Sequence, residues 1–405
     1  MLDWFKENFD PVTFISILLL LVIGSLSVYS ATYDAGASKY FYRQLVWAAI
    51  GLSLMLMVMM VPLRTLQLLS YPVYGLSVLA LVAVLIAGRT IAGSTSWFGV
   101  KGFGLQPSEI VKATTILAMA SYLSARQVNL SRMGDLFKAA SFAMLPVVLI
   151  ILEPDMGTAI IYVGMTIIML YWAGLSNFTI IAFSAPGFAA VAALFGTAPF
   201  LVVMFVTLAT LLLLRENRFL SSIAFSLTVL VGISVQVIFA KLAPHQQKRI
   251  LIFMNPEMDP LGAGYNVMQS KIAIGSGGLF GKGYLQGTQT QLNFLPAQWT
   301  DFIFCVPSEE FGFAGALLII GLLTILLFRG VYIAKTVKSR YASMVAIGVT
   351  ATYLVHTLIN VGMSMGIFPV IGDPLPFLSY GGSNLLTNLV MGGLLLNMYA
   401  NRKEY

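Results

Sequence analysis

A single carboxylate lies where a long polar stretch of the chain meets a strongly apolar run. Asp301 follows Thr300 and precedes the apolar residues 302–304. A carboxylate at the mouth of a membrane helix is costly to desolvate, so it is usually paired, hydrated or functional. Alternatively, Thr300 or Asp301 would cap the next helix by accepting hydrogen bonds from its first free N–H groups. The residues alone favour a functional carboxylate and a helix cap about equally.

A pair of opposite charges begins another apolar run. Glu109 and Lys112 are three residues apart, so they share one face of a helix for which Pro107 suits the first position. Opposite charges one turn into a membrane helix should pair and point into the bundle. The pair is either an internal salt bridge that orders the bundle or a polar floor beneath a substrate cavity.

A third acidic position, Asp155, lies in the turn between two consecutive apolar runs. Pro154 forces the turn, and Gly157 with Thr158 begins the next helix. Asp155 would either cap that helix or join Glu109 and Lys112 in one charged cluster. We favour the cluster, because one lysine between carboxylates makes a coherent network.

A long polar loop, residues 241–301, precedes Asp301. Within it, residues 267–274 predict a short amphipathic or re-entrant helix, and the glycines of 275–283 predict a tight turn with exposed N–H groups. With Arg249, Lys271 and Lys282 nearby, such a turn would suit a phosphate. The same cations could instead contact lipid headgroups.

The composition defines the class of protein that must position these groups. The chain has 405 residues, of which 58% are hydrophobic and 10% charged. This predicts a polytopic, all-α membrane protein. The net charge of +7 indicates basic cytoplasmic loops and contact with anionic membrane lipid, not nucleic acid. The single cysteine, Cys305, excludes an intrachain disulfide, and His245 and His356 lack metal-ligand spacing.

Twelve apolar runs are long enough to be considered as membrane helices. We place them at 12–31, 43–61, 69–87, 107–124, 138–152, 157–173, 178–196, 199–214, 220–240, 302–328, 343–364 and 384–400. If the N-terminus lies in the cytoplasm, the short loops that face the cytoplasm contain most of the Lys and Arg residues, as is usual for membrane proteins. We therefore expect both termini in the cytoplasm and the loop 241–301 outside. The first run lacks a preceding basic segment, so we expect it to be retained as a helix.

Several sequence motifs resemble one family. They are LP-x-x-x-TDFIF followed by EE-x-G-x-x-G around Asp301, QPSE-x-x-K at 106–112, and LPFLSYGGS at 375–383. Together they resemble the SEDS (shape, elongation, division and sporulation) membrane glycosyltransferases over nearly the whole chain. The loop motifs DPLGAGY, QSKIAIGSGG and GTQTQLNFLP resemble the rod-shape branch of this family more than its division branch.

The resemblance implies a fold of ten helices, so the twelve runs predict a single SEDS domain, 1–405, with an inserted helical hairpin within about 178–214. The chain departs from the family pattern in two places. Ala297-Gln298-Trp299 stands where members show a Glu and a His before the catalytic Asp, and Asp373 stands where an apolar residue is usual. The missing His leaves Asp301 as the acid–base candidate of that turn.

The resemblance also implies the activity. It is polymerisation of lipid II on the outer face of the bacterial cytoplasmic (inner) membrane during cell elongation, with Asp301 as general base. The substrate-binding residues that we predict are Glu109, Lys112, Asp155, Arg249, Lys271, Lys282 and Thr300. The substrate pyrophosphate would be neutralised by these cations or by Mg²⁺ or Mn²⁺, with no other cofactor expected. The implied partners are a class B penicillin-binding protein transpeptidase and other membrane proteins of the elongation complex. A lipid II flippase and a non-enzymatic scaffold are the alternatives.

Overall fold

The computed structural model describes residues 8–34, 36–91, 94–100, 103–214, 218–241, 247 and 264–403. Contacts divide the chain into two compact units, one of residues 1–173 with 269–405 and one of residues 174–268. Arg249 lies outside the described residues, as does most of the loop 242–263.

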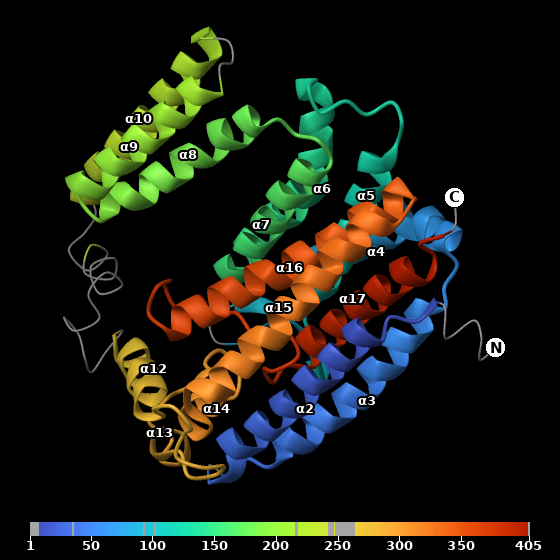
Figure 1. The fold of residues 1–405 in the computed structure, drawn as a ribbon, viewed down its shortest axis with the longest axis vertical. Coiled ribbons are helices and arrows are strands. Elements are labelled where there is room, and N and C mark those ends of the chain that lie inside the picture. Colours follow the sequence, from blue (N-terminus) through green and yellow to red (C-terminus); the bar gives the residue numbers. More distant parts are fainter. Residues whose placement is uncertain are drawn as a thin grey trace. The chain divides into compact units, whose positions relative to one another are not determined.

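The first unit is a bundle of long helices (Figure 1). They are α2 (Pro11–Tyr33), α3 (Lys39–Met59), α4 (Leu63–Ala87), α5 (Pro107–Ser124), α6 (Met133–Leu152), α7 (Met156–Trp172), α15 (Gly312–Thr336), α16 (Arg340–Ser364) and α17 (Gly382–Ala400). Helix α16 is central, because it packs against α5, α7, α15 and α17. Its apolar window is 72% buried, against 22% for α4. The outer helices therefore present apolar side chains to lipid, whereas α16 forms the interior.

Each of the twelve apolar runs forms a helix in the described chain, which confirms the polytopic helical fold. Eight of the helices are long and apolar enough to cross a membrane by length and composition, and α7 and α9 (Thr197–Leu213) are shorter apolar helices. The prediction for 302–328 is wrong at its start. A short helix, α14 (Cys305–Glu310), ends at Phe311, and α15 begins at Gly312 and continues to Thr336.

Gly312 explains this break. Its φ is +64°, and a Cβ there would lie 2.4 Å from the backbone nitrogen of Gly281. Only glycine allows this backbone conformation together with such a close approach. The chain therefore turns at Gly312 against the loop that follows α12 (Tyr265–Ser276), and the long helix cannot start at Phe302.

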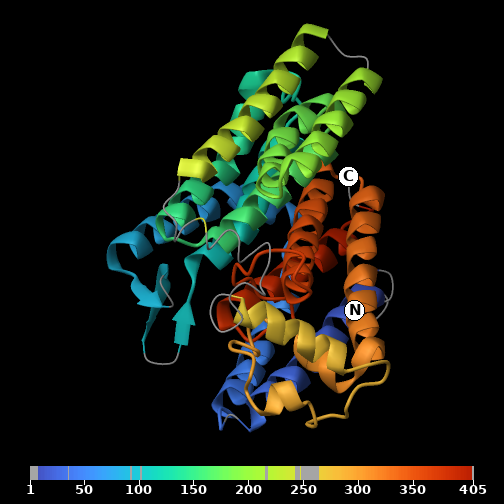
Figure 2. The same ribbon diagram turned by 90° about the vertical axis from the view of Figure 1, so that its left-hand side faces the viewer.

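The segment before α5 forms a small antiparallel sheet that the sequence patterns did not indicate (Figure 2). Its strands are β1 (Arg89–Ile91), β2 (Ser94–Val100) and β3 (Phe103–Leu105), in the order β1-β2-β3. Gly99 pairs with Gly104. A Cβ on Gly104 would lie 2.8 Å from the Trp97 ring, so glycine at this position lets the ring lie across β3.

The second unit consists of α8 (Asn177–Leu194), α9 and α10 (Arg218–Lys241), with α8 packed against both neighbours. It contains the segment 178–214 for which a hairpin insertion is predicted.

Deletion of residues 178–214 with a short rejoining linker is expected to preserve polymerising activity per folded molecule. The reason is that every residue lining the cavity described below belongs to the first unit. Because α10 loses its packing against α8, we expect a lower yield and melting temperature. Polymer formation from lipid II is the measurement. If the deletion protein is correctly inserted but inactive, these helices are required for activity and are not a peripheral insertion.

Candidate active site

A cavity of about 250 Å³ lies in the first unit, where α5, α7 and α17 begin. Its walls include four of the residues predicted to form the site: Asp301, Thr300, Glu109 and Asp155. Aromatic side chains of α3, β2 and the segment before α17 complete it, namely Trp47, Trp97 and Tyr380. Carboxylates drawn from three distant parts of the sequence therefore face one space.

Asp301 projects from a tight turn and not from a helix end. Ala297 has a φ of +54°, and its carbonyl oxygen accepts from the backbone N–H groups of Thr300 (3.1 Å), Asp301 (3.1 Å) and Phe302 (3.3 Å). The next helix, α14, is preceded by Phe304. The helix-cap alternative for Thr300 and Asp301 is therefore wrong, and the Asp301 carboxylate is available to the cavity.

The surroundings of Asp301 make its carboxylate a better proton acceptor. Burial raises the pKa of Asp301 to about 6, a hydrogen bond from Thr300 opposes this, and the charge of Asp373 adds to it. A carboxylate with a pKa near neutrality holds a proton more strongly than an exposed aspartate but is still ionised at pH 7. This is the combination that a general base requires.

The segment before α17 holds the Asp301 turn in place. Ser379 Oγ donates to the Thr300 carbonyl oxygen at 2.7 Å, and Tyr380 N donates to the Trp299 carbonyl oxygen at 2.8 Å. Residues 380–383 also line the cavity. The irregular LPFLSYGGS segment thus forms a wall of the cavity.

Glu109 and Lys112 form the predicted pair on α5. Lys112 Nζ lies 2.8 Å from Glu109 Oε2, and Asn384 Nδ2 donates to the same oxygen at 3.0 Å. Glu109 lines the cavity, whereas Lys112 is fully buried beneath it. The lysine therefore supports the cavity wall and does not itself line the cavity.

Asp155 caps α7, the alternative that we did not favour, and it also interacts electrostatically with Glu109 and Lys112. Its carboxylate accepts from Thr158 N (3.1 Å) and Thr158 Oγ1 (2.9 Å), and from Gln106 Nε2 (3.0 Å). Burial raises the pKa of Asp155, and the bonds from Thr158 oppose the shift. Asp155 shares the cavity with Glu109, but among the described residues Lys112 makes no ion pair with it.

Neither described cation of the long loop lines the cavity. Lys282 Nζ lies 2.8 Å from Glu309 Oε1 and donates to Thr288 Oγ1 at 2.7 Å. Burial raises the pKa of Glu309, but the bonds from Lys282, Gln289 and Thr290 outweigh it, so the pKa lies below its usual range. Lys271 is exposed on α12. A phosphate site built from Lys271 and Lys282 remains a prediction, to which this geometry adds no support.

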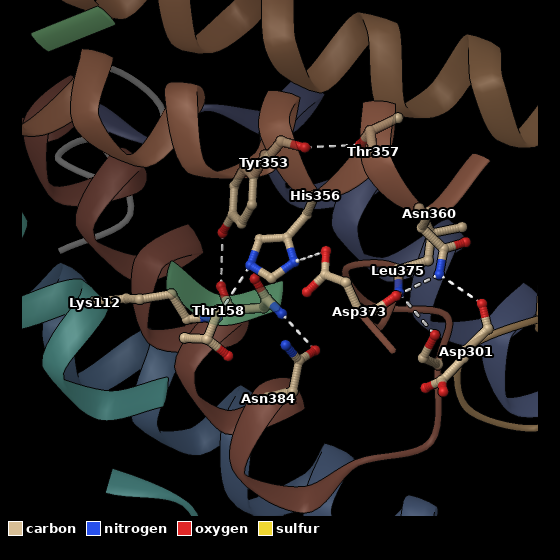
Figure 3. A network of polar contacts seen from close by, with 12 residues as sticks. Lys112, Thr158, Asp301, Tyr353, His356, Thr357, Asn360, Asp373, Leu375 and Asn384 are labelled. Carbon is tan, nitrogen blue, oxygen red and sulfur yellow. Dashed lines mark hydrogen bonds and ion pairs between the residues drawn. The ribbon is translucent and has the colours of Figure 1, made fainter. Parts of the chain in front are cut away.

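The sequence patterns missed two polar residues behind the cavity, His356 on α16 and Asp373 in the segment before α17 (Figure 3). His356 Nε2 lies 3.0 Å from Lys112 Nζ, and His356 Nδ1 lies 2.9 Å from Asp373 Oδ2. Asn360 Nδ2 donates to the carbonyl oxygens of Asp301 (2.9 Å) and Asp373 (2.7 Å). A usable signal existed, because His356 and Asn360 are four residues apart and so lie on one face of an apolar helix.

This fold and this cavity define a polytopic helical membrane protein with a buried, carboxylate-lined site. A family model described as cell cycle protein, FTSW_RODA_SPOVE, matches residues 11–206 and 195–404. Peptidoglycan glycosyltransferase RodA of Treponema pallidum is 35% identical over an alignment that covers 98% of both chains. Peptidoglycan glycosyltransferase MrdB of Escherichia coli is 33% identical, over 99% of this chain and 96% of that protein.

Solved structures agree. One chain, from a study titled "Structural coordination of polymerization and crosslinking by a peptidoglycan synthase complex", matches with a TM-score of 0.76 at 27% identity. The match covers 98% of this chain and 99% of that one. The rod shape determining protein RodA of Thermus thermophilus matches with a TM-score of 0.65 at 25% identity, over 98% of both chains. The chain belongs to the FtsW/RodA/SpoVE family, as its motifs indicated.

Proposed function

We propose that this protein is a peptidoglycan glycosyltransferase that polymerises lipid II, with Asp301 as the general base. The observation that carries the proposal is the Asp301 carboxylate, which is half-buried, lines the cavity and has a pKa raised to about 6. Proteins that are 33–35% identical over nearly their whole length bear the name peptidoglycan glycosyltransferase. We further propose that the cavity opens toward the outer face of the cytoplasmic membrane, because the basic short loops favour a cytoplasmic N-terminus.

The proposed chemistry needs one base. The 4-hydroxyl of an acceptor sugar attacks the anomeric carbon of the donor and forms the new glycosidic C–O bond. Asp301 accepts the hydroxyl proton, and the bond from the anomeric carbon to the lipid pyrophosphate breaks with its electron pair on the pyrophosphate. Because pyrophosphate is already a good leaving group, no second carboxylic acid is required, unlike in glycosidases. A positioned base contributes roughly 10²–10⁴-fold.

The described residues do not form a ready site for a divalent cation. No group of three or more His, Cys, Asp or Glu side chains that could hold a metal occurs among them. Glu109 is engaged by Lys112 and Asn384, and Asp155 is engaged by Thr158 and Gln106. We therefore derive no step through Mg²⁺ or Mn²⁺.

Purified protein, together with its transpeptidase partner, should convert lipid II into glycan polymer detectable by gel electrophoresis. Translocation of lipid II across vesicles without polymer would instead indicate a flippase. Neither polymer nor translocation, from a folded complex, would indicate a scaffold. Each outcome separates one of the three functional classes.

We propose a class B penicillin-binding protein as the partner, acting through the loop that precedes Asp301. Supporting this, the loop is fastened beside α14 by two buried glutamates. Glu309 accepts from Gln289 N (2.9 Å) and Thr290 N (3.0 Å), and Glu310 accepts from Leu285 N (3.0 Å). A shift of this loop would therefore be transmitted to α14 and the adjoining Asp301 turn.

Partner binding is expected to increase hydrogen-exchange protection in residues 264–300 and to raise the polymerisation rate. The physical reason is that ordering the loop fixes the position of the Asp301 turn. Exchange measured by mass spectrometry with and without partner is the test, with α17 as the internal reference. A clear rate increase with unchanged protection would rule out the loop as the relay.

A further inference from the structure

A row of buried polar groups runs behind the cavity from α5 to the Asp301 turn. Lys112, His356 and Asp373 are 0%, 0% and 2% exposed. Lys112 joins Glu109 on one side and His356 Nε2 on the other, at 2.8 Å and 3.0 Å. Figure 3 shows the imidazole between Lys112 and Asp373. Buried polar groups are costly unless they are partnered, so this row has a defined arrangement.

The contacts define the proton positions on His356. Lys112 carries only donors, so His356 Nε2 must accept. The other ring nitrogen, Nδ1, then carries a proton and lies 2.9 Å from Asp373 Oδ2. This contact has the distance of an ion pair without the alignment of a hydrogen bond. His356 thus presents the positive edge of a dipole to the Asp373 carboxylate and holds it in place.

Asp373 is connected to Asp301, the proposed base, through Asn360. Asn360 Nδ2 donates to the carbonyl oxygens of both Asp301 and Asp373. Gly372, next to Asp373, has a φ of +69°, and a Cβ on it would lie 3.4 Å from Asp301 Oδ2. The two carboxylates therefore lie on neighbouring backbone segments, and the charge of Asp373 acts on Asp301.

We propose that Asp373, held by His356, is a positioning residue whose negative charge strengthens Asp301 as the base. This inference rests on the proposed function of Asp301. Removing the charge of Asp373 should weaken the base without removing it. The other titratable groups at this site are Glu109 and Lys112 on α5, Asp155 before α7, His356 on α16, and Tyr380. Of these groups, His356 is the one that contacts Asp373 directly, so its own substitutions are tested separately.

The pH dependence of lipid II polymerisation tests the proposal. Asp301 must be ionised to accept a proton, so kcat/KM should fall as the pH drops through the pKa of Asp301, about 6. A like charge raises the pKa of a carboxyl group, so Asp373→Asn should move this acidic limb to lower pH. The limb should stay above the ordinary aspartate range, because burial is the main cause of the raised pKa. The plateau rate should also fall, because a weaker base is a poorer catalyst.

Substitutions of His356 distinguish a positioning effect from general damage. His356→Leu should also move the limb, because it releases the Asp373 carboxylate. His356→Gln should restore the limb, because an amide can accept from Lys112 and donate toward Asp373. If Asp373→Asn does not fold, the double variant H356L/D373L replaces the buried contact with apolar groups, which proteins often tolerate. It should show the same shift.

Asp10→Asn is the matched control. Asp10 is a buried carboxylate whose Oδ1 lies 2.8 Å from Arg329 Nη2. It precedes the first residue of α2, whereas Ser30, near the other end of α2, contacts the long loop through Gln291. Asp10→Asn should lower stability and leave the limb unmoved. If the acidic limb of the pH profile does not move in Asp373→Asn or in H356L/D373L, while Asp301→Asn is inactive, the role of Asp373 is wrong but the role of Asp301 as base still stands. An active Asp301→Asn would overturn the proposed base itself.

Discussion

Asp301→Asn is expected to abolish glycan polymerisation while the protein remains folded. The change is nearly isosteric and removes only the negative charge and the proton-accepting oxygen. The turn is held by backbone contacts, from Ala297 O to the N–H groups and from Tyr380 N to Trp299 O, and these do not involve the carboxylate. We therefore expect a loss of roughly 10²–10⁴-fold in rate, measured as polymer formed from lipid II by purified protein.

The control for Asp301→Asn is its melting temperature, which should stay close to that of the parent or rise slightly. The half-buried Asp301 carboxylate, whose pKa is raised to about 6 by desolvation, has a folded-state pKa above its unfolded value. Ionising it above pH 6 therefore opposes folding, and a neutral amide removes that cost. Full activity of a folded Asp301→Asn protein would remove Asp301 from the mechanism.

Lys112→Ala is expected to cause the largest loss of stability, about 3–5 kcal/mol, and loss of activity with it. The side chain is fully buried. Its removal leaves the Glu109 carboxylate without its cation and His356 Nε2 without the donor 3.0 Å away. Thermal and denaturant unfolding of the purified protein is the measurement. A Lys112→Ala protein that melts like the parent would contradict a dry, buried ion pair.

Two variants make this prediction sharper. Lys282→Ala removes a lysine that is also paired at 2.8 Å, but its side chain is 26% exposed and Glu309 keeps its bonds from Gln289 and Thr290. The loss should therefore be much smaller. Adding Glu109→Gln to Lys112→Ala should recover part of the stability, because it removes the uncompensated charge.

The features of the structure that depend on residues close together in the sequence could be predicted. Each long apolar run had to become a helix, because lipid offers no partner for a free N–H or C=O group and a helix satisfies them within the segment. The pairing of Glu109 with Lys112 followed from a spacing of three residues on one helix face. The choice of Asp301 came from motifs whose resemblance to a family the comparisons confirm.

Local patterns misplaced the features that depend on distant backbone. The helix expected from residue 302 begins at Gly312 because that glycine packs against Gly281. The sequence around Asp155 allowed two roles, a helix cap or a member of a charged cluster. In the structure Asp155 caps α7 and also accepts a hydrogen bond from Gln106, which precedes α5. Cations close to one another in the sequence did not meet at the cavity, because Lys282 turns to Glu309.

The sequence by itself determined that this chain is a polytopic membrane protein of this family and that Asp301, Glu109 and Lys112 are its notable charges. Composition, helical spacing and motif words are all properties of neighbouring residues. Only the tertiary structure decided that His356, 244 positions from Lys112, lies between that lysine and Asp373. Such a contact depends on how α16 packs against α5 and α17. Helix packing is set by many side chains distributed over the whole bundle, so no local pattern in the chain records it.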